Sequence, residues 1–371
     1  MNPVYRSEHP RPDFKRENWL NLNGPWDFCF DPRGVGEKEG WPGRRQFNGK
    51  INVPFAIEAE LSGVGCSNPP RLAWYLRRFQ LPEKMRGQRV FLHFGAVDYR
   101  ARCWLNGDYL GEHSGGYTPF SFEITRQLQP GENYLTVQVE DSLSLQQVRG
   151  KQNFFKRKKN FLVHYTPVTG IWQTVWLEGA GRAMLKSVRV STQLQPPSVT
   201  LAPVLDGGRG DEILHIEIFD PQGRPCGGAS LAGEEISAGA AVPLKEVYPW
   251  SPEQPHLYRV VYTLSVGEEL QDRVESYFGL REISIEGNRI FLNGKPLYQK
   301  LLLNQGYYPR GHYTAPDDQT LRRDVEMVKE MGFNGVRMHQ KVEEKRFLYW
   351  CDTLGLLVWG EMPSFYWPTR R

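Results

Sequence analysis

Residues 280–371 contain three short apolar segments that alternate with helical patterns, and each segment ends in polar side chains. These side chains are Asn304 and Gln305 after the first segment, Arg337 and His339 at the end of the second, and Glu361 after the third. Strands that alternate with helices indicate a parallel sheet, and α/β barrels build active sites at the carboxyl ends of such strands. We therefore expect the first three βα units of a TIM (β/α)8 barrel, a fold whose complete form needs about 250 residues.

Two amphipathic helices are expected between and after these strands. In the first helix, apolar residues recur at spacings of three and four: Leu321, Val325, Val328 and Met331. Asp317 or Asp318 can cap its start, and Gly332 can end it. The second helix ends at Gly355 and places four apolar residues on one side: Phe347, Trp350, Cys351 and Leu354.

Residues 1–182 contain short alternating apolar and polar segments separated by turn signals. The strongest hairpin signal is Asn106–Gly107, because both positions of a two-residue turn favour residues that accept a positive φ. Many short strands at this spacing favour a jelly-roll sandwich.

Residues 183–279 form a smaller unit, with strands expected at 185–190, 213–219 and 258–266. This spacing fits an immunoglobulin-like β-sandwich that lacks the Cys–Trp–Cys hallmark of antibody domains. The remaining domain, 280–371, opens with a hairpin around Asn293–Gly294 and then becomes the partial barrel. The expected organisation is an all-β jelly roll, an immunoglobulin-like sandwich and a partial catalytic barrel.

Charge and cysteine usage exclude several classes of function. A net charge of +4 in 371 residues is too small to indicate nucleic acid or an anionic membrane as partner. We find no apolar segment long enough for a membrane span, and the start of the chain lacks the apolar stretch of a signal peptide. The five cysteines are an odd number and form no C-x-x-C pair. These features argue against a disulfide framework and a structural zinc site, and they predict a reduced, cytoplasmic protein.

The sequence supports no cofactor or metal site. The eight histidines form no H-x-x-x-H or H-E-x-x-H arrangement, and no G-x-G-x-x-G follows an expected strand. A G-x-S-x-G nucleophile elbow is also missing. The basic run Lys156–Lys159 lies between phenylalanines, which is compatible with a nucleic-acid patch. A solvated loop is the more ordinary interpretation of four charges in a balanced chain.

The barrel segment contains the candidate substrate-binding residues. Side chains two apart in a strand share a face, so Arg337 and His339 point the same way, and Glu361 continues the face of the third strand. Burying an unpaired charge costs several kcal/mol, so we expect these residues to line the mouth of the barrel. A structural ion pair between Arg337 and Glu361 is the alternative, and both interpretations can hold. Asn304 and Gln305 are suited to hydrogen-bonding hydroxyl groups, and a role in the loop fits them equally well.

The chain resembles glycoside hydrolase family 2, the family of β-galactosidases, β-glucuronidases and β-mannosidases. In the first domain, the segments similar to family motifs are 19–26, 74–79, 105–120 and 170–178. Residues 278–281 and 292–296 resemble the entry to the family's barrel, and 332–337 and 351–358 resemble two of its barrel segments. Together these motifs are specific and cover nearly the whole chain.

The resemblance implies that Arg337 and Glu361 help to shape a sugar site for a β-glycoside, with a β-galactoside as the first choice. Family members use a retaining mechanism with two glutamates, which follow the fourth and seventh barrel strands. Because the chain ends after the third strand, we expect no catalytic residue in it and no activity of these residues alone. His339 follows Arg337 by two residues rather than the family's three.

Three further expectations concern association and the alternative function. The unpaired barrel strands predict that the isolated chain associates through 280–371 or leaves this region poorly ordered. A homo-oligomer is possible for a family member. The alternative to an enzyme is a non-catalytic carbohydrate-binding module protein, in which the jelly roll binds sugars.

Overall fold

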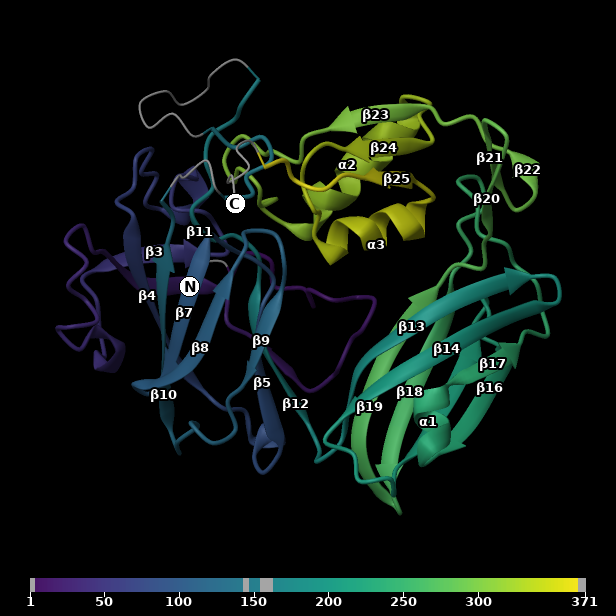
Figure 1. The fold of residues 1–371 in the computed structure, drawn as a ribbon, viewed down its shortest axis with the longest axis horizontal. Coiled ribbons are helices and arrows are strands. Elements are labelled where there is room, and N and C mark those ends of the chain that lie inside the picture. Colours follow the sequence, from purple (N-terminus) through teal and green to yellow (C-terminus); the bar gives the residue numbers. More distant parts are fainter. Residues whose placement is uncertain (1–3, 143–146, 154–162, 366–371) are drawn as a thin grey trace, which may run out of the picture.

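The computed structural model describes residues 4–142, 147–153 and 163–365, and it consists of two β-sandwiches and a partial barrel (Figure 1). The jelly roll, the immunoglobulin-like sandwich and the three-strand part of a TIM barrel that the sequence predicts are all confirmed. The basic run 156–159 lies outside the described residues.

The jelly roll has two principal antiparallel sheets, a two-stranded pairing and three short 3-10 helices. The six-stranded sheet has the order β3 (Gly49–Val53), β2 (Gly24–Phe30), β4 (Leu72–Gln80), β10 (Glu132–Glu140), β7 (Arg100–Leu105), β8 (Asp108–Ser114). The four-stranded sheet has the order β1 (Trp19–Asn21), β12 (Val175–Ala180), β5 (Arg89–Phe94), β9 (Phe120–Glu123). The remaining elements are β11 (Gly170–Ile171), β6 (Val97–Asp98), η1 (Trp41–Gly43), η2 (Glu60–Ser62) and η3 (Glu83–Met85).

The core of the jelly roll lies between its two main sheets. Trp26 and Tyr75 from the larger sheet pack in one cluster with Leu92 and Leu177 from the smaller sheet. The predicted hairpin joins β7 to β8, and Asn106 and Gly107 have φ values of +56° and +96°. The positive φ at both positions explains why the sequence signal was correct there.

The immunoglobulin-like sandwich packs a three-stranded sheet on a four-stranded sheet. The first has the order β13 (Met184–Leu194), β14 (Pro197–Asp206), β17 (Ala240–Pro243). The second has the order β16 (Pro225–Ala232), β15 (Ile213–Phe219), β18 (Tyr258–Val266), β19 (Glu269–Phe278). A short helix, α1 (Glu234–Ala238), precedes β17.

The third region has an antiparallel hairpin sheet followed by three parallel strands and two helices. The hairpin sheet contains β20 (Ile283–Glu286), β21 (Arg289–Leu292) and β22 (Lys295–Pro296). The parallel strands are β23 (Leu301–Asn304), β24 (Gly335–Met338) and β25 (Leu357–Gly360). The helices are α2 (Asp318–Glu330) and α3 (Lys345–Leu354).

The two faces of the parallel sheet differ as the strand periodicity predicts. Val336 and Met338 are buried in a cluster with apolar residues of α2 and α3. Leu303, Arg337 and Trp359 lie side by side in the register and are exposed on the other face. This face is the one that turns toward the centre of a barrel.

The ends of α2 agree with the sequence prediction. Asp317, not Asp318, is the N-cap, and its carboxylate accepts the Thr320 backbone N–H at 2.7 Å. Gly332 follows the helix with a φ of +84°. Asp318 instead joins the helices, because it accepts hydrogen bonds from Arg346 at 2.8 Å and from Trp350 at 3.0 Å.

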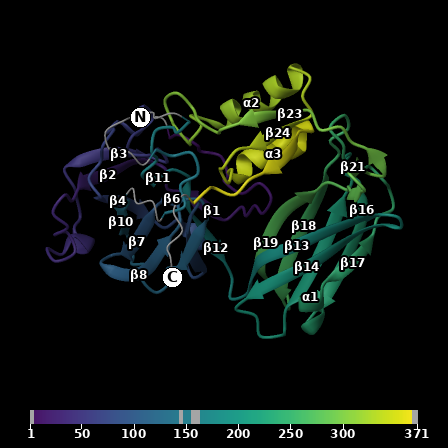
Figure 2. The same cartoon turned by 45° about the horizontal axis from the view of Figure 1, so that its top comes forward.

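The partial barrel contacts both sandwiches, and Figures 1 and 2 show it above them from two directions. Its contact with the jelly roll includes the Thr314 hydroxyl, which donates to the Trp172 carbonyl at 2.5 Å. Its contact with the second sandwich includes the Trp250 indole, which donates to the Asp352 carbonyl at 2.7 Å. Both sandwiches therefore contact the partial barrel, one through the loop before α2 and the other through α3. No helix among the described residues has the length and apolar character needed to cross a bilayer.

Candidate functional site

The five predicted site residues lie at the carboxyl ends of the three parallel strands. Arg337 Nε donates to a carboxylate oxygen of Glu361, so β24 and the segment after β25 are joined by an ion pair. The Gln340 backbone N–H donates to the other oxygen of Glu361 at 3.2 Å. His339 Nδ1 lies 3.2 Å from Gln305 Oε1 and connects β24 to the end of β23. His339 Nε2 lies 3.9 Å from Glu361 Oε2, so four of the five residues form one group.

Asn304 is engaged differently from the other four. Its Oδ1 accepts the Gly306 backbone N–H at 2.7 Å, and its own carbonyl accepts the His339 N–H at 2.9 Å. These bonds shape the turn after β23. The loop role that the sequence left open for Asn304 is therefore present in the structure.

The electrostatics of the group suit binding of a polar ligand. Burial and the positive charges of Lys151 and Arg337 lower the pKa of His339 below its ordinary value, against the opposing charge of Glu361. A neutral imidazole can both donate and accept hydrogen bonds. Arg337 is half exposed, and its ion pair with Glu361 is in contact with solvent, so this pair contributes little to folding stability. It orients the two side chains.

Lys341 is a buried residue that holds the loop after β23, and the sequence did not identify it. The side chain is 1% exposed, and its ammonium donates to the carbonyls of Gly306 at 2.9 Å and Tyr313 at 3.2 Å. It also pairs with the buried Glu343 at 2.9 Å. Gly306 has a φ of +62°, and a Cβ there would lie 2.6 Å from Lys341 Nζ, so both the backbone and the buried lysine favour glycine at this position. The available signal was the departure from the family pattern at Gln340–Lys341.

Trp172 and Tyr117 of the jelly roll and Tyr313 of the barrel region form an aromatic cluster around Lys341. Lys341 Nζ lies 4.8 Å from the ring centroid of Tyr313 and 5.6 Å from that of Trp172. The hydroxyls of Tyr117 and Tyr313 are 3.1 Å apart. The backbone N–H groups of Arg149 and Gly150 donate to the Ser364 carbonyl at 3.2 Å. The jelly roll thus positions the segments on both sides of the candidate site.

Buried carboxyl groups lie on the jelly-roll side of this contact. Burial raises the pKa of Asp98 to about 7, and the neighbouring Asp141 adds to the shift. Burial also raises the pKa of Glu58 to about 8, although the Thr169 backbone N–H donates to its carboxylate at 2.9 Å. Both groups therefore hold protons more tightly in the folded chain than in the unfolded chain.

Glu58 is expected to make the stability of the chain depend on pH. Its folded pKa of about 8 exceeds the unfolded value near 4.5, so its contribution is complete below about pH 4.5 and is lost as the pH rises through 8. Replacing Glu58→Gln should remove a decline on the order of a few kcal/mol between these pH values. Urea unfolding at several pH values measures this, with the exposed Glu60→Gln as control. Parallel pH curves for wild type and Glu58→Gln would contradict the prediction.

The described part of the chain contains no group of three His, Cys, Asp or Glu side chains that could hold a metal ion. The polar groups of the candidate site are a guanidinium, an imidazole, an amide and a carboxylate. Such a set can orient the hydroxyl groups of a sugar.

Comparison with known families gives the same domain order. Residues 20–161 match the sugar binding domain of glycosyl hydrolases family 2, 210–281 match a further domain model of that family, and 283–365 match its TIM barrel domain. The chain belongs to glycosyl hydrolases family 2. The resemblance seen in the sequence motifs is thereby confirmed.

Curated relatives of this family 2 chain include both galactosidases and glucuronidases. A β-galactosidase of Thermoanaerobacter pseudethanolicus is 30% identical, and the match covers 79% of this chain and 40% of that protein. A β-glucuronidase of Paenibacillus borealis is 24% identical over 93% of this chain and 59% of that protein. The chain thus spans between about 40% and 60% of the length of these relatives.

Among solved structures, an apo β-glucuronidase from Ruminococcus gnavus superposes with a TM-score of 0.81 at 22% sequence identity. The alignment covers 97% of this chain and 62% of the glucuronidase. At this identity the likeness establishes the fold.

Proposed function

We propose that the chain forms the sugar-site end and the supporting domains of a retaining β-glycosidase that acts on β-galactosides. The observation that carries the proposal is the connected group of Gln305, Arg337, His339 and Glu361 at the carboxyl ends of three parallel strands. This is the end of the sheet where barrel enzymes bind substrate. The β-galactosidase relatives favour galactosides over the β-glucuronides named among the other relatives.

The proposed roles follow from the contacts. Gln305 and the neutral His339 bind sugar hydroxyls, and Arg337 holds Glu361 in position for the same purpose. Retaining hydrolysis needs two carboxyl groups about 5–5.5 Å apart, one as acid and one as nucleophile. Both oxygens of Glu361 already accept hydrogen bonds, from Arg337 and from Gln340. We therefore propose that residues 1–371 alone bind and orient a sugar and do not cleave the bond.

The test of this proposal combines turnover and binding. The 371-residue chain should show no hydrolysis of nitrophenyl β-galactoside, β-glucuronide or β-mannoside. Calorimetry should detect galactose binding that weakens about tenfold in Arg337→Met, because a charge-assisted contact is removed. Arg323→Met, an exposed arginine of α2, is the matched control. Clear turnover by the pure chain would refute the claim of inactivity, and tighter binding of glucuronate at this site would assign it to β-glucuronides.

The cytoplasmic location, the homo-oligomeric state and the association through 280–371 stay predictions. They follow from the sequence and from the family, and sedimentation of the purified chain measures the last two.

A further inference from the structure

A cavity of about 400 Å³ lies where the three domains meet, away from the candidate sugar site. We call it the junction cavity. Its walls come from β5, β9 and β12 of the jelly roll, the segment before β1, the start of β13, the end of β14 and residues 342–345 of the barrel. None of the five candidate sugar-site residues lines it. Its volume is within the range of pockets that bind small organic molecules.

The floor of the junction cavity is an uncharged row across three strands. Trp176, His93 and Ser121 are register partners on β12, β5 and β9, on the face opposite the jelly-roll core. The His93 ring stacks on Trp176 with centroids 4.9 Å apart and an interplanar angle of 16°. Burial lowers the pKa of His93 to about 4, so this ring is neutral at neutral pH. The floor therefore offers ring surface together with a hydroxyl group.

The carboxylates around the junction cavity are all neutralised by basic partners. Glu344 pairs with Arg6 at 2.6 Å. Asp206 pairs with Arg89 at 2.9 Å, and Glu343 pairs with Lys341 at 2.9 Å. A ligand in the cavity consequently meets no unpaired negative charge from these three groups.

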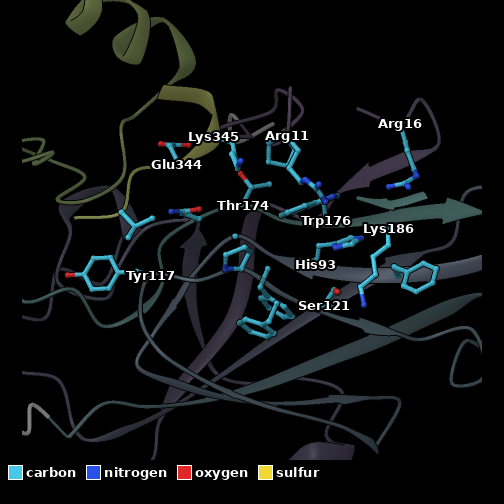
Figure 3. A pocket seen from close by; sticks show the side chains of 18 of the residues that line it. Arg11, Arg16, His93, Tyr117, Ser121, Thr174, Trp176, Lys186, Glu344 and Lys345 are labelled. Atoms are coloured by element: carbon cyan, nitrogen blue, oxygen red, sulfur yellow. The ribbon is translucent and has the colours of Figure 1, made fainter. Parts of the chain in front are cut away.

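Two cations of the same walls have no such partner. Neither Arg11 nor Lys186 lies within 4 Å of an acidic side chain in the described part of the chain, although the Arg11 charge helps to lower the pKa of the buried Glu178. Figure 3 shows Arg11 above His93 and Lys186 beside it, with the lysine side chain extending toward Ser121. The cavity thus combines an apolar floor with Lys186, which has no acidic partner among the described residues, and with Arg11, whose nearest negative influence is the buried Glu178 beyond ion-pair distance. Charge complementarity favours an anion as occupant.

We propose that the junction cavity binds a small carboxylate carried on a six-membered ring, either a sugar acid or an aromatic acid. The ring lies on the floor formed by His93 and Trp176, and the carboxylate lies between Lys186 and Arg11. This proposal rests on the cavity alone and is independent of the proposed glycosidase function. An occupant there contacts the jelly roll, the second sandwich and the barrel at once, so it stabilises their junction.

Titration calorimetry of the 371-residue chain tests the proposal with four probes. Glucuronate and benzoate represent the two kinds of ring acid, and methyl glucoside and benzyl alcohol are their neutral counterparts. We expect saturable binding of at least one acid, about tenfold or more tighter than its neutral counterpart. The acid that binds more tightly identifies the source of the carboxylate.

Matched variants locate the binding. Lys186→Met and Arg11→Met should each weaken the acid about tenfold. Lys295→Met removes an exposed lysine from the distant β22 hairpin and should leave binding unchanged. The proposal is overturned if no acid binds, if acids and neutral probes bind alike, or if Lys186→Met behaves like Lys295→Met. If only Arg337→Met weakens binding of the acid, the acid binds at the sugar site, and the proposal is also overturned.

Discussion

Replacing Arg16→Met is expected to lower the free energy of unfolding by about 3–5 kcal/mol, because it removes one member of a buried ionic cluster. Arg16 is buried between the jelly roll and the second sandwich. It makes two 2.9 Å hydrogen bonds to Asp272 on β19 and pairs with Glu178 on β12. Its guanidinium also donates to the Leu185 carbonyl at 2.5 Å. The variant leaves two buried carboxylates without their cation.

Urea unfolding at neutral pH measures this effect, with Arg273→Met as control. Arg273 pairs with the exposed Glu17, so its loss should change stability far less. The companion variant Arg16→Met/Glu178→Gln/Asp272→Asn should recover part of the lost stability, because it also removes the unpaired charges. Equal effects of Arg16→Met and Arg273→Met would show that the cluster does not hold the two sandwiches together.

The Arg16 cluster also shows what the sequence could not predict. Arg16 and Asp272 are 256 positions apart, and neither lies in a motif or a periodic pattern that links them. Their contact depends on how two domains pack, which no local rule describes. The sequence therefore predicts the two sandwiches without predicting what joins them.

Sequence rules that involve only nearby residues predicted the features that depend on a single helix, strand or turn. The alternation of β24 placed Val336 under the helices and Arg337 on the open face, since side chains in a strand alternate between faces. The Asp317 cap and the Asn106–Gly107 turn depend on residues within a few positions of each other. The ion pair between Arg337 and Glu361 could be predicted as well, because neighbouring parallel strands bring their ends together.

Such local rules could not predict that Lys341 is buried and bonded to the loop beside the candidate site. From the sequence alone, Lys341 is expected to be an ordinary surface lysine, because lysine is almost never fully buried without a partner. Its partners come from the loop after β23, from Tyr313 and from Glu343. The loop between β23 and α2 must pack against residues 341–343 before the environment of this ammonium exists.

Replacing Lys341→Met is expected to cost about 3–5 kcal/mol of folding stability and to loosen the loop that carries Gln305. The variant leaves Glu343 buried without its cation and removes the donor to the carbonyls of Gly306 and Tyr313. Burial already raises the pKa of Glu343, so this carboxyl group depends on the lysine charge to stay ionised. Urea unfolding measures the stability, and hydrogen exchange of residues 305–313 measures the loop.

The exposed Lys345→Met removes a lysine that pairs with Asp13 at the surface and is the matched control. Lys341→Met/Glu343→Leu should regain part of the stability, because replacing both members of a buried pair by apolar residues is often neutral. The loop should nevertheless stay loose in this double variant, since the two carbonyls still lack their donor. Restored protection of residues 305–313 in the double variant would mean that charge burial alone, and not the hydrogen bonds from Lys341, holds the loop under the sugar site.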